Sequence, residues 1–273
     1  MNKKIYTILT NLIAWLISII SLVPLLLILF NSLKTSLSAS DMNLKLPHFP
    51  FQWSNFSLVI AKGKLVQSFI NSSIYTVGSV FICCILSAMA AYVLSRNRTK
   101  LTKLIYFFIV LGITMPVNYV ALVRVMMMLQ LNNTRLGIVL LYAAMQIPFS
   151  VFLLYGFISK IPVELDEAGI IDGCSPIRLF VTIVFPLLKP AVATVIVLTF
   201  LNNWNEFVSP LYFLSSSTKW PMTLSVYNFF GMFFKDWNLV CADIVMTSIP
   251  VILIYLFGQK YIVSGMTSGA VKG

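Results

Sequence analysis

The chain has 273 residues, of which 59% are apolar and only 10% are charged, and its formal net charge is +11. Ordinary soluble domains carry about 25% charged residues, so this composition excludes a soluble enzyme or binding module and indicates a membrane protein. The basic residues are explained by membrane topology, as shown below, and therefore do not indicate nucleic-acid binding.

Six apolar runs are long enough to cross a hydrocarbon core about 30 Å thick, which takes about 20 helical residues. They cover residues 5–30, 69–94, 104–123, 136–158, 191–214 and 240–261. Backbone polar groups in lipid must be satisfied within the segment, and runs of this length do not match the alternating pattern of barrel strands. The expected fold is therefore an all-α membrane protein with six transmembrane helices.

Basic residues in the short loops predict the orientation of these spans. The densest short loop, RNRTK at 96–100, falls on the same side as both termini if there are six spans, and that side holds 11 of the 19 basic residues. By the positive-inside rule this side is cytoplasmic. The first apolar run is longer than a signal-peptide core and lacks a small-residue cleavage site, so we expect a retained anchor.

Enzyme motifs are missing from the sequence. It contains no P-loop GxxxxGK[ST], no HExxH and a single histidine, His48, which rules out most histidine-based catalytic schemes. The four cysteines show no disulfide or metal spacing. We therefore expect no catalytic residue, no metal and no cofactor, and the chain should not hydrolyse ATP unaided.

Half of the eight acidic residues lie within ten positions, namely Glu164, Asp166, Glu167 and Asp172. Pro162 suits the first position of a helix, which places the first three acids near the positive end of the helix dipole. Asp172-Gly173 is expected to end this helix, because glycine accepts the left-handed conformation of a C-cap.

A second helix is expected directly after this turn, with Ser175 as its N-cap and Pro176 as its first residue. Its apolar stripe would consist of Ile177, Phe180, Val181 and Val184. A solvated loop with local capping is one interpretation. The loop has about 30 residues where bundle connections usually have roughly 2 to 8, and its acids stand on the basic side of the chain. These two facts favour a docking surface.

The segment 167–173, followed nine residues later by Ile183 and Phe185-Pro186, resembles the EAA loop of the membrane-spanning subunits of ABC importers. Gly169 replaces the second alanine of that motif and Phe185 replaces a leucine. The resemblance implies that the loop forms a coupling helix seated in an ATPase subunit. By this resemblance, Glu167 would pair with a basic ATPase residue. Ala168 and Gly169 would allow close approach, and Asp172 and Gly173 would form the turn.

The resemblance extends to NNWNEFVSPL at 202–211 and to the tail YIVSGMTSGAVKG at 261–273, which are similar to the second permease of maltose-type sugar importers. It implies a bacterial cell-membrane protein that pairs with a homologous second permease, two ATPase subunits and an extracytoplasmic solute-binding protein. We expect one permease domain over 1–273, with an anchor and external loop at 1–67, a core at 68–262 and a cytoplasmic tail at 263–273. Alone, the glycine-containing tail should be disordered.

Polar residues within or beside the spans are candidates for a sugar pathway, because hydroxylated solutes need side chains that donate and accept hydrogen bonds. They are Asn118, Tyr119, Asn202, Asn205 and Glu206. Interhelical hydrogen bonding or an interfacial position would also explain them. An ion-driven secondary transporter or channel remains the alternative function, although no internal repeat is visible and the spans contain only two acids, Glu206 and Asp243.

Overall fold

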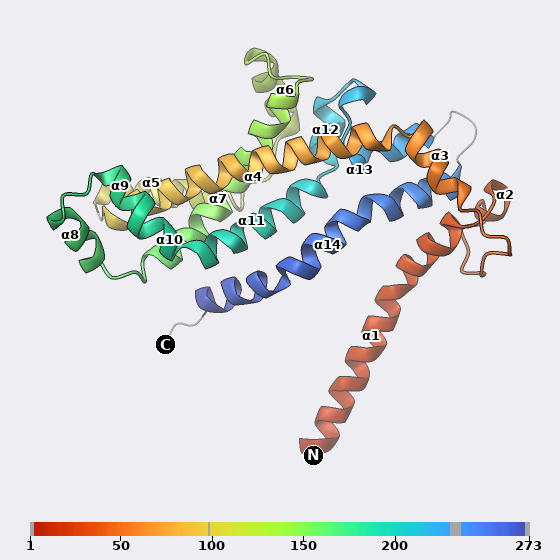
Figure 1. The fold of residues 1–273 in the computed structure, drawn as a ribbon, viewed down its shortest axis with the longest axis horizontal. Helices are drawn as coiled ribbons and strands as arrows, with labels where there is room; N and C mark the ends of the chain where they lie inside the picture. The colour runs from red at the N-terminus through yellow and green to blue at the C-terminus, as the bar shows by residue number, and fades with distance from the viewer. Residues whose placement is uncertain (1–2, 98, 230–235, 271–273) are drawn as a thin grey trace. The chain divides into compact units, whose positions relative to one another are not determined.

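The computed structural model of the chain describes residues 3–97, 99–229 and 236–270. Within these ranges every regular element is helical. The backbone forms two compact units, one made of Met1–Ser68 with Met222–Ile249 and the other of Phe69–Pro221 with Pro250–Gly273. Two long helices, α4 (Leu65–Arg96) and α14 (Trp237–Ala270), belong to both units (Figure 1). Each unit is described by itself below.

Unit 1 contains α1 (Lys3–Ser32), α2 (Ser36–Ala39), α3 (Ser54–Lys62), α13 (Met222–Ser225), the 3₁₀ turn η3 (Val226–Phe229) and the start of α14. A buried lysine organises the connection after α1. Lys34 Nζ donates to Asn31 Oδ1 at 3.0 Å and to the Asn43 backbone and side-chain oxygens at 2.9 and 3.0 Å. Burial lowers the pKa of Lys34. Asp243, one of the two acids in the expected spans, accepts a 2.8 Å hydrogen bond from Ser225 Oγ.

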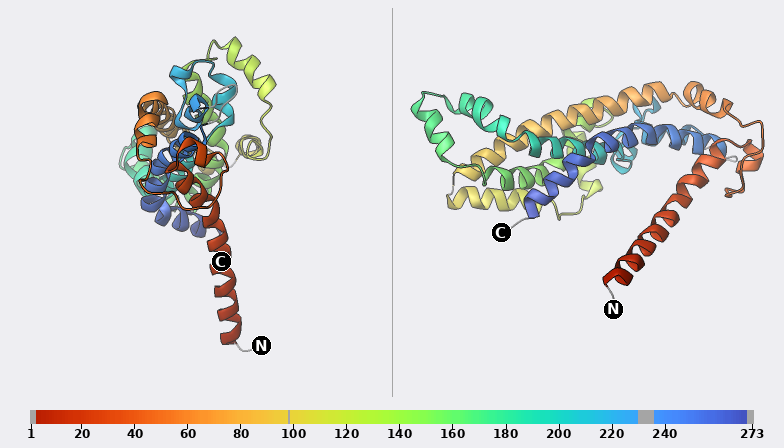
Figure 2. Two further views of the ribbon diagram at one scale, coloured as in Figure 1. Left: turned by 90° about the vertical axis from the view of Figure 1, so that its right-hand side faces the viewer. Right: turned by 60° about the horizontal axis from the view of Figure 1, so that its bottom comes forward.

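Unit 2 is built around α4, α7 (Arg135–Ile158) and α11 (Lys189–Trp204). Its core includes Ala88 and Ala91 from α4, Leu154 from α7 and Ala191 from α11. Both α5 (Lys100–Leu111) and α11 pack along α7, as Figure 2 shows from two further directions. Small side chains in α4 let neighbouring helices approach closely. In lipid, where the hydrophobic effect does not drive helices together, such close packing and interhelical hydrogen bonds hold them.

Polar contacts inside unit 2 join distant parts of the chain. Asn203 Nδ2 in α11 donates to Ser79 Oγ in α4 at 2.7 Å, and both residues are buried. Asn71 Nδ2 in α4 donates to the carbonyls of Thr218 and Trp220 at 3.0 and 3.1 Å. In a membrane such bonds satisfy polar groups that lipid cannot, so they fix α4 against its neighbours.

Within the described ranges, four continuous helical segments are long and apolar enough to cross a membrane, namely Tyr6–Ser32, Leu65–Arg96, Arg135–Ile158 and Trp237–Tyr261. The pair Pro176–Leu187 and Lys189–Trp204, bent by 78°, would make a fifth. These elements correspond to the expected first, second, fourth and sixth spans and to part of the fifth. The fold class is therefore confirmed, whereas the expected count of six spans is not.

The expected third and fifth spans are not continuous helices. Residues 104–123 divide between α5 and α6 (Tyr119–Met128), and Pro116, which lacks an N–H and disfavours helix in the residue before it, lies in the break. Residues 191–214 divide between α11 and α12 (Val208–Phe213). Both breaks interrupt runs that were read as continuous spans, and the second one contains Asn205 and Glu206.

The tail also differs from expectation. The backbone of α14 is helical through Ala270, where a disordered segment was expected from Ser264 onward, and residues 271–273 lie outside the described ranges. Extending an existing helix costs far less than starting one, so two glycines do not stop it. The prediction of disorder is therefore wrong for residues 264–270.

Candidate functional site

The acidic loop forms a compact helical group in unit 2, beside the end of α4 and the start of α5 (Figure 1). It consists of α8 (Glu164–Ile171), α9 (Pro176–Leu179), the π-helix η1 (Phe180–Val184) and α10 (Phe185–Leu187). Helix α8 begins at Glu164, slightly later than Pro162 suggested, with Val163 as its N-cap. Its first turn carries three acids, as predicted, where the positive end of the helix dipole stabilises them.

The turn after α8 is the predicted glycine turn. Gly173 has a φ of +78°, in the left-handed region. Its N–H donates to the Ile170 carbonyl at 3.0 Å, and the N–H of Cys174 donates to the Gly169 carbonyl at 2.9 Å. Together these two bonds form a Schellman motif, which satisfies carbonyls at the helix end and fixes the direction of the next segment.

The start of α9 also follows the prediction, because Ser175 Oγ accepts the Arg178 N–H at 3.4 Å and Pro176 is the first residue. The predicted apolar stripe is only partly correct. Val184 is buried, but Ile177 and Val181 are exposed. The π-helix explains this difference, because its wider turn buries Leu179 and Val184, which are five positions apart.

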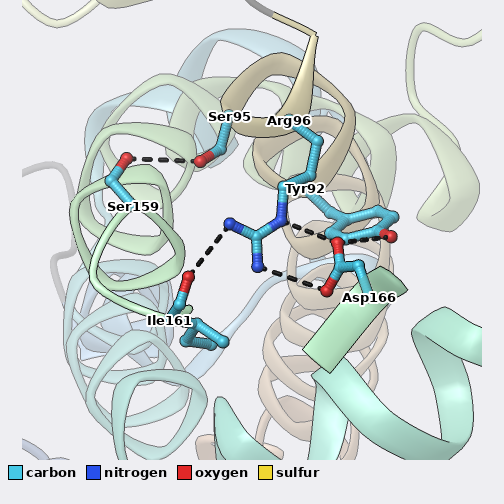
Figure 3. Close-up of polar contacts among 6 residues, drawn as sticks. All are labelled: Tyr92, Ser95, Arg96, Ser159, Ile161 and Asp166. Atoms are coloured by element: carbon cyan, nitrogen blue, oxygen red, sulfur yellow. Dashed lines mark hydrogen bonds and ion pairs between the residues drawn. The ribbon is translucent and has the colours of Figure 1, made fainter. Parts of the chain in front are cut away.

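One acid of α8 points inward. Arg96 Nε donates to Asp166 Oδ2 at 2.8 Å and Nη2 donates to Oδ1 at 3.3 Å, so the ion pair is bidentate (Figure 3). Tyr92 Oη donates to the same Oδ2 at 3.1 Å. The side chains of Arg96 and Asp166 are 13% and 8% exposed. Sequence reasoning missed this pair because its partners lie 70 positions apart.

Arg96 also contacts the segment that leads into α8. Its Nη1 donates to the Ile161 carbonyl at 3.1 Å, and the neighbouring Ser95 Oγ lies 3.2 Å from Ser159 Oγ at the end of α7 (Figure 3). The last turn of α4 is therefore joined to the end of α7, to the linker and to α8.

Gly169 faces inward as well. A Cβ at this position would lie 2.7 Å from Ile183 Cδ1 and 3.2 Å from Leu179 Cδ1. Gly169 thus permits a close approach between the two halves of the loop. This packing explains why glycine stands where the EAA motif has its second alanine. A larger residue here would push α8 away from η1.

The outward face of α8 and its turn combines acids with large apolar side chains. Glu167, Ala168 and Asp172 are exposed. Ile170, Ile171 and Ile177 are 64%, 84% and 76% exposed. Sequence reasoning did not single out these isoleucines, although two adjacent isoleucines in an acidic loop between spans are a signal that could have found them. Exposed apolar side chains grouped with charges are typical of protein interaction sites. We call the set Glu167, Ile170, Ile171, Asp172 and Ile177 the outer face.

The candidate pathway residues do not form a single cluster. Asn202 Nδ2 donates to Gln146 Oε1 at 3.3 Å, which joins α11 to the middle of α7. The rings of Tyr119 and Tyr212 stack with centroids 4.9 Å apart and an interplanar angle of 14°. Gln146 and Tyr212 were missed from the sequence, because a single amide or tyrosine within an apolar run gives no distinctive signal.

The other three candidates contact their local backbone. Asn118 caps α6 by accepting the Ala121 N–H at 3.1 Å, and Asn205 donates to the carbonyl of Leu201 at 2.9 Å. Glu206 Oε1 accepts the N–H of Ser209 at 2.8 Å, at the start of α12. Across the described ranges, no three His, Cys, Asp or Glu residues are grouped so that they could hold a metal ion.

Comparison with known proteins identifies relatives along most of the chain. It is 33% identical over 257 residues to a probable starch degradation products transport system permease protein of Thermoanaerobacterium thermosulfurigenes, covering 94% of this chain and 93% of that one. It is 34% identical over 268 residues to the melibiose/raffinose/stachyose import permease protein of Bacillus subtilis, covering 96% of both.

A solved structure has the same fold. It belongs to a bacterial ABC transporter involved in the import of the acidic polysaccharide alginate, with a TM-score of 0.83, 23% identity and coverage of 94% of this chain and 96% of that one. Residues 84–268 match the family model described as binding-protein-dependent transport system inner membrane component. The chain thus belongs to the family of inner-membrane components of binding-protein-dependent transport systems.

Proposed function

We propose that this chain is one permease half of a bacterial sugar importer and that its α8 to α9 loop docks on a separate ATPase subunit. The observation that carries the proposal is the outer face, where Glu167 and Asp172 lie among exposed isoleucines on a doubly capped turn. Exposed isoleucine supplies area to bury and the carboxylates supply charge complementarity to a basic cleft. The coupling residues on this surface or at its turn are Glu167, Ala168, Asp172 and Gly173. Gly169 packs beneath them on the buried side of α8.

The assembly that follows contains a homologous second permease, two ATPase subunits and an extracytoplasmic solute-binding protein. Both termini and the loop 160–190 face the cytoplasm of a bacterial cell, and the chain acts as one permease domain with an N-terminal anchor at 1–67, a core at 68–262 and a cytoplasmic tail at 263–273. The apolar helices and the family support a multi-pass membrane position. The basic loop at 96–100 supports the orientation.

The solute is proposed to be a sugar, in line with the sugars named for the relatives. Its pathway passes the Asn202–Gln146 pair, whose amides donate and accept, and the Tyr119–Tyr212 stack, which offers aromatic faces. The pathway is bordered at two helix breaks by Asn118, Asn205 and Glu206. Membrane proteins tolerate such breaks where the non-helical backbone lines a cavity. An ion-driven mechanism is disfavoured by the family, which serves binding-protein-dependent transport.

Reversing the charge of Glu167 tests the docking surface. Glu167→Lys should set like charges against a basic cleft and reduce co-purification of the ATPase subunit by roughly tenfold or more, with membrane abundance unchanged. Asp41→Lys, the same change at an exposed residue of unit 1, is the matched control and should retain the ATPase. Equal retention in both variants would contradict docking through α8.

Labelling of Cys174 tests the orientation. Cys174 is partly exposed, whereas Cys83, Cys84 and Cys241 are buried, so it is the expected site of reaction among the four. A membrane-impermeant maleimide should miss it in intact cells and label it in inverted membrane vesicles. The control is Ser38→Cys in a Cys174→Ser background, which should be labelled from outside. Labelling of Cys174 in intact cells would show that the proposed topology is inverted.

Replacing the pathway amides tests the sugar route. In cells that carry the complete importer, Gln146→Leu and Asn202→Leu should each lower the uptake efficiency for raffinose or maltotriose about 3- to 10-fold, because each removes a hydrogen bond to the solute. Gln67→Leu removes a partly exposed amide at the start of α4 and should have no effect. Unchanged uptake in both pathway variants would place the solute route elsewhere.

A further inference from the structure

We propose that Arg96 is a positioning residue for coupling, because its guanidinium, held on Asp166, makes α8 and α4 move as one body. The inference rests on the proposed function, in which the ATPase displaces α8. It goes further by naming the ion pair that transmits the movement of α8 and the helix, α4, to which that movement is transmitted.

The geometry of the pair suits it to transmit movement. Two parallel N–H···O bonds, at 2.8 and 3.3 Å, fix the orientation of the Asp166 carboxylate as well as its position. Tyr92 Oη adds a third bond to the same carboxylate from one turn earlier in α4. Gly169, on the same inward side of α8, packs near Leu179 and Ile183, and this apolar packing contributes no directional bonds. A push on the outer face therefore reaches α4 through a fixed joint.

Helix α4 leads from this joint toward the candidate pathway. Ser79 lies seventeen positions before Arg96, which is about 25 Å along a helix at 1.5 Å per residue. Ser79 is bonded to the buried Asn203 of α11, and the next residue back, Asn202, is bonded to Gln146. A shift of α4 at Arg96 thus acts on α11, which carries the pathway amide Asn202. Only a coupling measurement distinguishes such a route from mere proximity.

The experiment uses the complete importer, with both permeases and the ATPase subunits, in lipid nanodiscs. Two quantities are measured, namely the amount of ATPase retained and the ratio of ATP hydrolysis rates with and without the solute-binding protein, supplied with a mixture of raffinose, stachyose and maltotriose. The variants are Arg96→Gln, Arg96→Lys, Asp166→Asn and the charge swap Arg96→Asp with Asp166→Arg. Lys100→Gln is the control, because it removes an exposed basic residue from the adjacent start of α5.

Arg96→Gln and Asp166→Asn should retain the ATPase but lower the stimulation ratio about tenfold, which lies within the usual range of coupling between sites. Arg96→Lys should be impaired as well, because an ammonium group keeps the charge but loses the bidentate fork. The charge swap should recover part of the ratio. Lys100→Gln should match the wild type.

Three outcomes would overturn the inference. Stimulation equal to wild type in both single variants would show that the pair carries no coupling. Simultaneous loss of ATPase and stimulation, with no recovery in the charge swap, would show that the pair serves only to fold the loop. Absence of the ATPase from the wild-type complex would overturn the proposed function itself, and the inference with it.

Discussion

A buried carboxylate is stable only when it is paired, and this requirement sets the orientation of α8. Asp166 is held inside by Arg96 and Tyr92, and removing one partner of a buried ion pair typically costs about 3 to 5 kcal/mol. Successive residues of an α-helix are rotated by about 100°, so fixing Asp166 inward also turns Gly169 inward and leaves Glu167 and Ile171 outside. The exposure of Glu167 and Ile171 on the outer face therefore follows from one internal contact.

The turn at Gly173 holds the second half of that surface in place. The Schellman bonds and the Ser175 cap fix where α9 begins, so Ile177 stands on the exposed side together with Ile170 and Ile171. The π-helix then returns Leu179 and Val184 to the core. An inward anchor, a rigid turn and an outward apolar and acidic face thus occur within about 20 residues. This combination gives the loop a defined shape and a direct connection to α4, as the proposed docking requires.

Sequence reasoning was most successful where the signals were local. Apolar length identified α1, α4, α7 and α14, and the capping residues identified both ends of the turn around Gly173. It failed where the deciding contact was distant. Nothing near Asp166 indicates that Arg96 is its partner, and nothing near Gly169 indicates Ile183. The helix breaks at 112–118 and 205–207 were also missed, although Pro116 in the first and Asn205 and Glu206 in the second are local signals that could have indicated them.

The central claim is that the inward ion pair presents the outer face to the ATPase, and photo-crosslinking tests it most directly. A benzophenone amino acid is placed at Ile171, which is 84% exposed, or at Phe49, which is 87% exposed but lies in unit 1. On irradiation of the complete importer in membranes, the Ile171 probe should form an adduct that contains the ATPase subunit, and the Phe49 probe should not. An ATPase adduct from Phe49, or none from Ile171, would contradict the account.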